Sequence, residues 1–190
     1  MNIQRKIIYE QRREVLDGED LQKNIQSMIH FVIDGIVHSA FGEQKHLADR
    51  AQFNDMMRHV EGVYLPVHSW TVTDEELSSL TGEQAEEKLL SLMKAFYAAK
   101  EKHYTSAVMR EIERVITLRV VDEYWMDHID AMDDLRQGIR LRAYAQDDPV
   151  VAYKREGFEM FEALTSAIKE EIVHRLFAFS LKEDEPVKRK

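Results

Sequence analysis

The sequence predicts an all-α fold in which long scaffold helices carry an antiparallel helical hairpin and a small inserted helical lobe. Glycine and proline are scarce, with 7 and 3 copies among 190 residues, too few for a turn-rich β architecture. Charged residues make up 32% and hydrophobic residues 44%, as is typical of a folded, helix-rich protein. Between Ser106 and Ile139 there is no proline and the first glycine is Gly138, which predicts a helix about 50 Å long.

Residues 1–41 are expected to form two helices. The first runs to about Leu16 and starts without a preceding loop, so we expect it to be cut from a longer helix. Its apolar stripe consists of Ile3 and Ile7, while other apolar side chains point elsewhere, which indicates more than one neighbour. After the turn-forming Asp17-Gly18 pair, a second helix to about Phe41 repeats apolar residues every three or four positions. These residues are Leu21, Ile25, Met28, Ile29, Val32, Ile36 and Ala40.

Residues 42–105 are predicted to form the inserted lobe, with shorter helices and more breaks. A short helix around Phe53–Val60 cannot continue beyond Leu65, because the residue before a proline avoids the α region. Thr73 with Glu76, and Thr81 with Gln84, have the spacing of a capping box and predict two helix starts. The second of these helices has an apolar face made of Ala85, Leu89, Leu92, Met93 and Phe96.

Residues 106–180 are predicted to form the hairpin, with its tip at about 140–148. The second long helix should begin at Asp148-Pro149, a capping carboxylate followed by proline at the first helical position. Its predicted face carries Phe158, Phe161, Leu164, Ile168, Ile172, Leu176 and Phe179. Residues 181–190 form a charged run that we expect to be a solvated tail.

Composition and motifs exclude several classes of function. The net charge of −9 argues against a nucleic-acid binder, and the absence of cysteine excludes disulfides and thiolate metal sites. No apolar run approaches the roughly 20 residues of a membrane span. No glycine is followed by lysine, so this chain contains no phosphate-binding GxxxxGK[ST] loop. We therefore predict no catalytic, cofactor-binding or metal-binding residue in this chain.

Two clusters of acidic and histidine residues have the residue types of a metal site. Glu-x-x-His occurs at Glu43/His46 and Glu171/His174, a motif of carboxylate-bridged metal bundles, but His174 should point away from the apolar face of its helix. A second group, of acidic residues and His128, is scattered around the long helix. This arrangement predicts a solvated face, part of which could dock a partner. The residues of this group are Asp122, Glu123, Asp127, His128, Asp130, Asp133 and Asp134.

The approach to the hairpin tip carries an unusual group of residues. Trp125 is interpreted first as an inter-helix anchor and second as a docking residue, and Arg136 and Arg140 are further docking candidates. Arg142 also lies close to the tip, and Tyr144 falls in the non-helical connection. Tyr144 is either exposed at the apex, where it offers an apolar face with a polar end, or folded back onto the hairpin.

The stretch from Ile116 to Leu164 strongly resembles SecA, the family of ATP-driven motors of bacterial protein export. Its most specific parts are WMDHIDAMDDLRQGI, LRAYAQDDP and YKREGFEMF. The segment NIQRKIIYEQRREVLDG at the start resembles the central scaffold helix of the family. The resemblance covers essentially the whole chain and is looser over the inserted lobe. The nucleotide-binding folds, the preprotein-binding domain and the cysteine-containing tail of the family are not in this sequence.

The resemblance implies a role for each part of the chain. Residues 1–41 and those from 106 onward would form the helical scaffold, 42–105 the helical wing, and the hairpin the two-helix finger that enters the mouth of the SecY (SecYEG) channel. It implies a cytoplasmic protein bound peripherally to the bacterial plasma membrane, acting on unfolded preprotein. ATP and Mg would bind in the absent nucleotide-binding domains of the parent protein. The residues implied to contact preprotein at the fingertip are Tyr144, Leu141, Arg142, Ala143, Ala145 and Gln146.

Three further expectations accompany this assignment. Scaffold surface meant for the absent domains should be exposed, so the chain could form a homodimer around Ile3, Ile7 and Ile8. A free-standing helical scaffold or adaptor is the second function class. A carboxylate-bridged metal bundle is the third.

Overall fold

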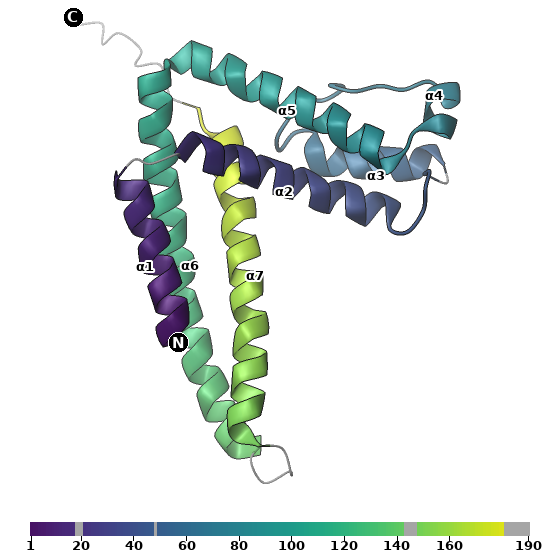
Figure 1. Cartoon of the computed structure of the whole chain (residues 1–190). Helices are drawn as coiled ribbons and strands as arrows, with labels where there is room; N and C mark the ends of the chain where they lie inside the picture. Colours follow the sequence, from purple (N-terminus) through teal and green to yellow (C-terminus); the bar gives the residue numbers. More distant parts are fainter. Residues whose placement is uncertain (18–20, 48, 143–147, 181–190) are drawn as a thin grey trace, which may run out of the picture.

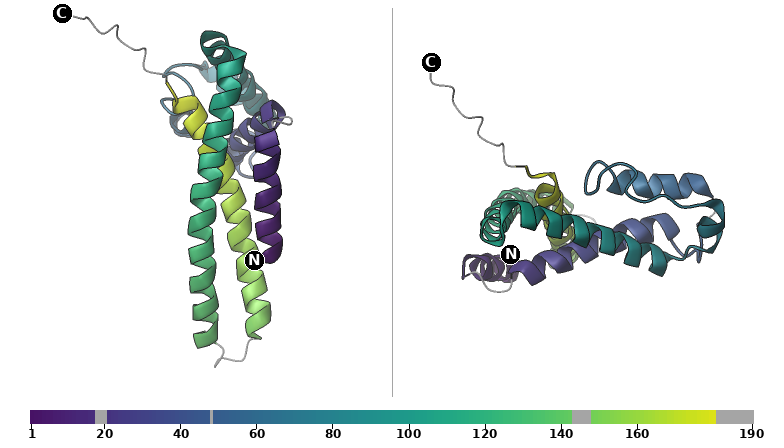
Figure 2. Two further views of the ribbon diagram at one scale, coloured as in Figure 1. Left: turned by 90° about the vertical axis from the view of Figure 1, so that its left-hand side faces the viewer. Right: turned by 90° about the horizontal axis from the view of Figure 1, so that it is seen from above.

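The structure, a computed structural model, describes residues 1–17, 21–47, 49–142 and 148–180, and these form two helical arms that meet at one end (Figure 1). In the first arm α6 (Ser106–Arg142) and α7 (Pro149–Ala178) run antiparallel, and α1 (Asn2–Asp17) lies along α6. In the second arm α2 (Leu21–Phe41) and α5 (Gly82–Tyr104) project sideways and carry α3 (Arg50–Val60) and α4 (Asp74–Ser79), as the view from above in Figure 2 shows. The all-α prediction is confirmed.

Helix starts in the lobe and in the hairpin follow local capping chemistry. The hydroxyl of Thr73 accepts a hydrogen bond from the Glu76 amide at 3.2 Å, and the Glu76 carboxylate accepts one from the Thr73 amide at 2.8 Å. Thr81 and Gln84 form the same reciprocal pair at the start of α5. The carboxylate of Asp148 accepts from the Val150 amide at 2.8 Å. All three predicted starts are confirmed, and each cap stabilises its helix by about 1 kcal/mol.

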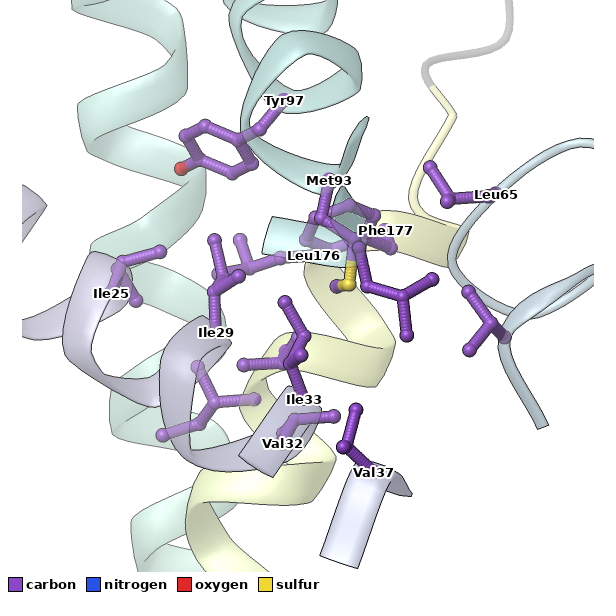
Figure 3. Packing of buried hydrophobic residues seen from close by; sticks show 14 of the residues in the cluster. Ile25, Ile29, Val32, Ile33, Val37, Leu65, Met93, Tyr97, Leu176 and Phe177 are labelled. Atoms are coloured by element: carbon purple, nitrogen blue, oxygen red, sulfur yellow. The ribbon is translucent and has the colours of Figure 1, made fainter. Parts of the chain in front are cut away.

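The hydrophobic core lies where α2, α5, α6 and α7 meet. Apolar side chains from these four helices are almost fully buried there; among them are Ile25, Ile29, Ile33, Met93, Met109, Ile172 and Leu176. Figure 3 shows Phe177 among them, and its ring lies 5.8 Å from that of Tyr64, 6.0 Å from Phe96 and 5.9 Å from Tyr97. Both arms therefore share one core, and neither has an independent apolar centre of comparable size within the described residues.

Most of the predicted face of α7 is confirmed, because Leu164, Ile168, Ile172 and Leu176 are buried, but Phe158 at one end of it and Ile8 of α1 are not placed as predicted. In α1 the buried side chains are Ile8 and Val15, whereas Ile3 is 77% exposed, because α1 packs mainly on α6 along the opposite side. In α7 the predicted Phe158 is 60% exposed and the neighbouring Gly157 is buried. Gly157 allows close packing on α6, since a Cβ at this position would lie 2.9 Å from the Cε of Met132.

A buried carboxylate lies beside the elbow where α5 turns into α6. Glu113 is fully buried on α6, accepts a hydrogen bond from the Tyr97 hydroxyl through Oε1, and pairs with Nη2 of Arg110 at 3.0 Å. The same Arg110 nitrogen lies 3.1 Å from Glu101, while the second oxygen of Glu113 has no partner among the described residues. Burial raises the pKa of Glu113 to about 7.

Replacing Glu113 with glutamine should change how stability depends on pH. Between pH 4.5 and about 7 the folded protein binds a proton that the unfolded chain releases, so the free energy of unfolding falls as pH rises through this window. The glutamine side chain would still accept from Tyr97 but cannot ionise, so Glu113→Gln should exceed the wild type in stability by about 1–2 kcal/mol above pH 7. Urea unfolding at pH 5 and pH 8 measures this.

The matched control for this comparison is Glu111→Gln, which removes an exposed carboxylate from the same helix. It should leave the pH dependence of the wild type in place. Parallel pH profiles for the wild type and Glu113→Gln would contradict the prediction.

Candidate functional site

The candidate functional site is the hairpin of α6 and α7, which extends away from the shared core (Figure 1). Its packing surface continues along α6 through Trp125, Met132 and Ile139, all of which are buried. The ring of His128 lies close to two aromatic rings, 5.5 Å from that of Trp125 and 5.9 Å from that of Phe161 in α7. The hairpin is thus a pair of helices packed from the core to within one turn of the end of α6.

Ion pairs tie neighbouring helices together along this hairpin. Arg175 of α7 donates to Glu123 of α6 at 2.8 Å and to Glu171 at 2.6 Å, and the hydrogen bond from Arg175 lowers the pKa of Glu123. Arg12 of α1 donates to Asp122 at 2.9 Å, which raises the pKa of the Arg12 guanidinium. Because the Glu123 and Asp122 carboxylates are exposed to solvent, these pairs between helices contribute little to the stability of the fold.

The prediction of a solvated acidic face is corrected in part by these contacts. Asp122 and Glu123 bridge to neighbouring helices, and the nearby His128 is only 5% exposed. The face differs from the prediction because α1 covers part of α6, which the sequence pattern of α6 alone does not reveal.

A glutamine of α1 joins all three helices of the scaffold arm. The Gln4 side-chain amide donates to the carbonyl oxygen of Gly157 in α7 at 2.8 Å. Its oxygen lies 3.2 Å from Nε2 of His128 in α6. Burial lowers the pKa of His128. Figure 2 shows the three helices side by side, so α1 braces the hairpin. Gln4 was not among the residues predicted from the sequence, because no local pattern marks it.

The structure places some of the predicted site residues and leaves others outside its description. Trp125 is 6% exposed, as expected for an anchor, and its indole nitrogen has no partner among the described residues. Arg136 is exposed and pairs with Asp133 at 3.1 Å. The side chains of Arg140, Leu141 and Arg142, together with the whole of Ala143, Tyr144, Ala145 and Gln146, lie outside the described residues. The fingertip contact therefore remains a prediction.

The backbone at the tip corrects one boundary. α6 continues to Arg142, three residues beyond the predicted end at Ile139, and α7 begins at Pro149 as predicted.

The two Glu-x-x-His motifs differ, since one histidine lies beside the glutamate of its own motif and the other contacts a backbone carbonyl. His174 lies 3.6 Å from Glu171 and is about half exposed, and the His46 ring nitrogen is 3.1 Å from the carbonyl of Leu80. Over the described ranges, no group of three histidine or carboxylate residues is placed to hold a metal ion. In the same ranges, no helix combines the length and apolar character of a membrane span.

Comparison with known proteins identifies the relatives of this chain. The family described as the SecA Wing and Scaffold domain matches residues 1–180. A protein translocase subunit SecA of Clostridium botulinum is 47% identical over 93% of this chain. SecA 1 of Clostridioides difficile is 44% identical over the whole chain, and SecA of Pelotomaculum thermopropionicum is 44% identical over 93%. The chain covers 20–21% of the length of these relatives.

The brace centred on Gln4 should be sensitive to acid. Because burial lowers the pKa of His128 in the folded protein, the unfolded chain binds a proton more readily. The free energy of unfolding should therefore fall as pH drops through the range between the unfolded pKa, about 6.5, and the lower folded one. His128→Gln should remove this part of the pH dependence, which denaturant unfolding at pH 7 and pH 5 detects.

The control is His38→Gln, which changes an exposed histidine of α2. It should retain the acid sensitivity of the wild type. An unchanged slope in His128→Gln would show that His128 does not produce this sensitivity.

Proposed function

Because this chain belongs to the SecA wing and scaffold family, we propose that it is the non-catalytic helical part of a protein-export motor. In this role it couples ATP-driven motion of nucleotide-binding domains elsewhere in a longer protein to the movement of unfolded preprotein through the SecY channel. ATP and Mg would act in those domains, and the whole protein would work at the cytoplasmic face of the plasma membrane. The observation that carries the proposal is the hairpin of α6 and α7, continuous with the shared core.

The packing of the hairpin supports a role in transmitting force. α6 contains 37 residues, so it spans about 55 Å. Its inner side is packed against α7, and α1 braces it laterally through Gln4 and Arg12. Closely packed elements pass displacement on instead of absorbing it. Motion delivered at the core end should therefore reach the tip with little loss.

The tip provides the proposed contact with preprotein. The resemblance implies that Tyr144 touches the translocating chain, with Leu141, Arg142, Ala143, Ala145 and Gln146 beside it. An aromatic side chain suits a sequence-tolerant contact, because it offers a broad apolar face that packs against many side chains. The segment connects the ends of two packed helices, which suits a contact that must follow their movement.

Exposed apolar residues on α1 support contacts with domains outside this chain or with a second copy. Ile3, Tyr9 and Leu16 are all at least half exposed. Ile8, the third residue of the predicted homodimer surface, is 1% exposed and packs inside the fold instead. A free-standing adaptor would also use such a surface, but it would not require the SecY channel.

Photo-crosslinking from position 144 tests the fingertip contact. In the longer protein, a photoreactive residue at this position should crosslink to a preprotein stalled in the SecY channel, and one at the exposed Phe158 on the flank of α7 should crosslink far less. Equal crosslinking at both positions would contradict the assignment. Failure of the longer protein to bind the SecY channel at all would favour the adaptor.

Tyr144→Ala should separate transport from folding. It should slow translocation in the longer protein while changing the free energy of unfolding by no more than about 0.5 kcal/mol, as for an exposed site. Tyr144→Phe keeps the ring and should retain most of the transport rate. Normal transport combined with a loss of about 3–5 kcal/mol, the cost of truncating a buried aromatic residue, would contradict the fingertip role.

Softening α6 at exposed positions tests force transmission. Asp130 and Asp134 are exposed, so their replacement does not disturb the core. Changing both to glycine in the longer protein should weaken the helix by about 1 kcal/mol per site relative to alanine and slow translocation. The matched variant with alanine at both positions removes the same charges and keeps the helix stiff. Equal translocation rates in the two variants would contradict transmission through a rigid hairpin.

A further inference from the structure

The joint between α5 and α6 has an unusual backbone conformation. α5 ends at Tyr104 and α6 begins at Ser106, so the single residue Thr105 connects two helices that meet at a sharp bend (Figure 1). Thr105 has a φ of 76° and a ψ of 150°, a conformation that is almost confined to glycine. A β-branched side chain makes this conformation still less favourable. The bent joint therefore stores backbone strain at one defined position.

The amino-acid sequence at the joint does not itself demand a bend. No glycine or proline occurs between Gly82, where α5 begins, and Gly138, near the end of α6. Helices bend or end most readily at these two residue types, and neither is present at the joint. Local preference would therefore run α5 and α6 together as one continuous helix, with Thr105 in the α conformation. The bend must be maintained by contacts between the two helices.

Four side chains form polar contacts across the joint, and we call them the elbow clamp. The Tyr97 hydroxyl of α5 donates to the Glu113 carboxylate of α6, which is fully buried. Arg110 of α6 donates to Glu101 of α5 at 3.1 Å, and the same nitrogen lies 3.0 Å from Glu113. Arg110 thus connects the two contacts to each other.

The elbow clamp can exist only while the joint is bent. At about 1.5 Å per residue, Tyr97 and Glu113 would lie about 24 Å apart along the axis of a continuous helix. Glu101 and Arg110 would be separated by about 13 Å on the same helix. Straightening the joint therefore breaks both contacts and relieves the strain at Thr105. The clamp and the strain act in opposite directions on one equilibrium.

We propose that the elbow is a two-state hinge that the clamp holds in its bent arrangement. In the second arrangement Thr105 is helical, α5 continues into α6, and the lobe has swung away from the hairpin. A single position that absorbs a large change in φ and ψ is sufficient for such a motion. The packing of α2 on α6 and α7 opposes the swing, so the bent arrangement predominates in the wild type. The hinge is a property of this chain and does not depend on the proposed role in protein export.

The test measures the distance between the lobe and the hairpin by double electron–electron resonance. The chain has no cysteine, so spin labels can be attached at Asn54→Cys in α3 and Gln137→Cys in α6, two exposed positions. The wild type should give one main distance. Tyr97→Phe combined with Glu101→Ala, the clamp variant, removes both contacts across the joint and keeps the aromatic ring in the core. It should raise the population with a longer distance by at least roughly tenfold.

Glu111→Ala is the matched control, because it removes an ion pair with Arg114 that lies within α6 and does not cross the joint. It should leave the distance distribution of the wild type unchanged. In the clamp variant, a distribution that is only broader and stays centred on the wild-type distance would show loosening without a second arrangement. That result would overturn the proposal.

Substitutions at Thr105 test the hinge separately from the clamp, in the wild type and in the clamp variant. Glycine adopts the bent backbone without strain, whereas alanine favours the helix. Thr105→Gly should therefore lower the population with the longer distance and Thr105→Ala should raise it, so that the two differ by at least about fivefold. Far-UV circular dichroism should show that both variants remain helical. Equal distance distributions for glycine and alanine in the clamp variant would also overturn the proposal.

Discussion

The burial of apolar side chains where α2, α5, α6 and α7 meet is the interaction on which the rest of the molecule depends. Ile29 and Ile33 of α2, Met93 of α5 and Leu176 of α7 are almost completely removed from solvent there (Figure 3). The buried side chains of the lobe belong to the same cluster as those of α2, α6 and α7. The core therefore holds the lobe in place and fixes the direction in which the hairpin leaves it.

Polar groups at the edge of this core determine how the helix ends are joined. Lys100 of α5 donates to the carbonyl oxygens of Leu176 and Phe177 at 2.9 and 2.6 Å, and burial lowers its pKa. The last carbonyls of a helix have no partner within the helix, so Lys100 supplies one from another element. Together with Glu113 at the elbow, it ties α5 both to the end of α7 and to the start of α6. The two arms are therefore joined by hydrogen bonds as well as by apolar packing.

Local sequence chemistry predicted the helices well, because caps act over three or four residues. The boxes at Thr73 and Thr81 and the Asp148-Pro149 start depend only on neighbours in the chain, and all three are present. The buried faces of α1 and α7 were harder to predict, since they depend on which side α6 approaches. A helical wheel placed Phe158 inward, whereas the neighbouring Gly157 is the residue that is buried and lies against the Met132 side chain of α6.

Long-range polar contacts were beyond the reach of sequence patterns. Gln4 lies 153 positions from its acceptor Gly157 and 124 from His128, and nothing in its surroundings in the chain marks it as a bridge. The anchor role of Trp125 could be predicted, because a large aromatic residue among charges in a long helix usually faces a neighbour. The fingertip assignment of Tyr144 depended on the family resemblance, and this residue lies outside the described part of the chain.

The common core of the two arms gives the molecule the geometry of a bent lever with its fulcrum in that core, at the level of Val121. Beyond Val121, α6 extends to Arg142, a distance of about 30 Å at about 1.5 Å per residue. Tilting the whole body by roughly 10° would sweep that end through about 5 Å, close to one helical pitch. A rotation of this size, applied at the lobe, would thus move the end of α6 by more than the spacing of residues in an extended polypeptide, which is about 3.3 Å.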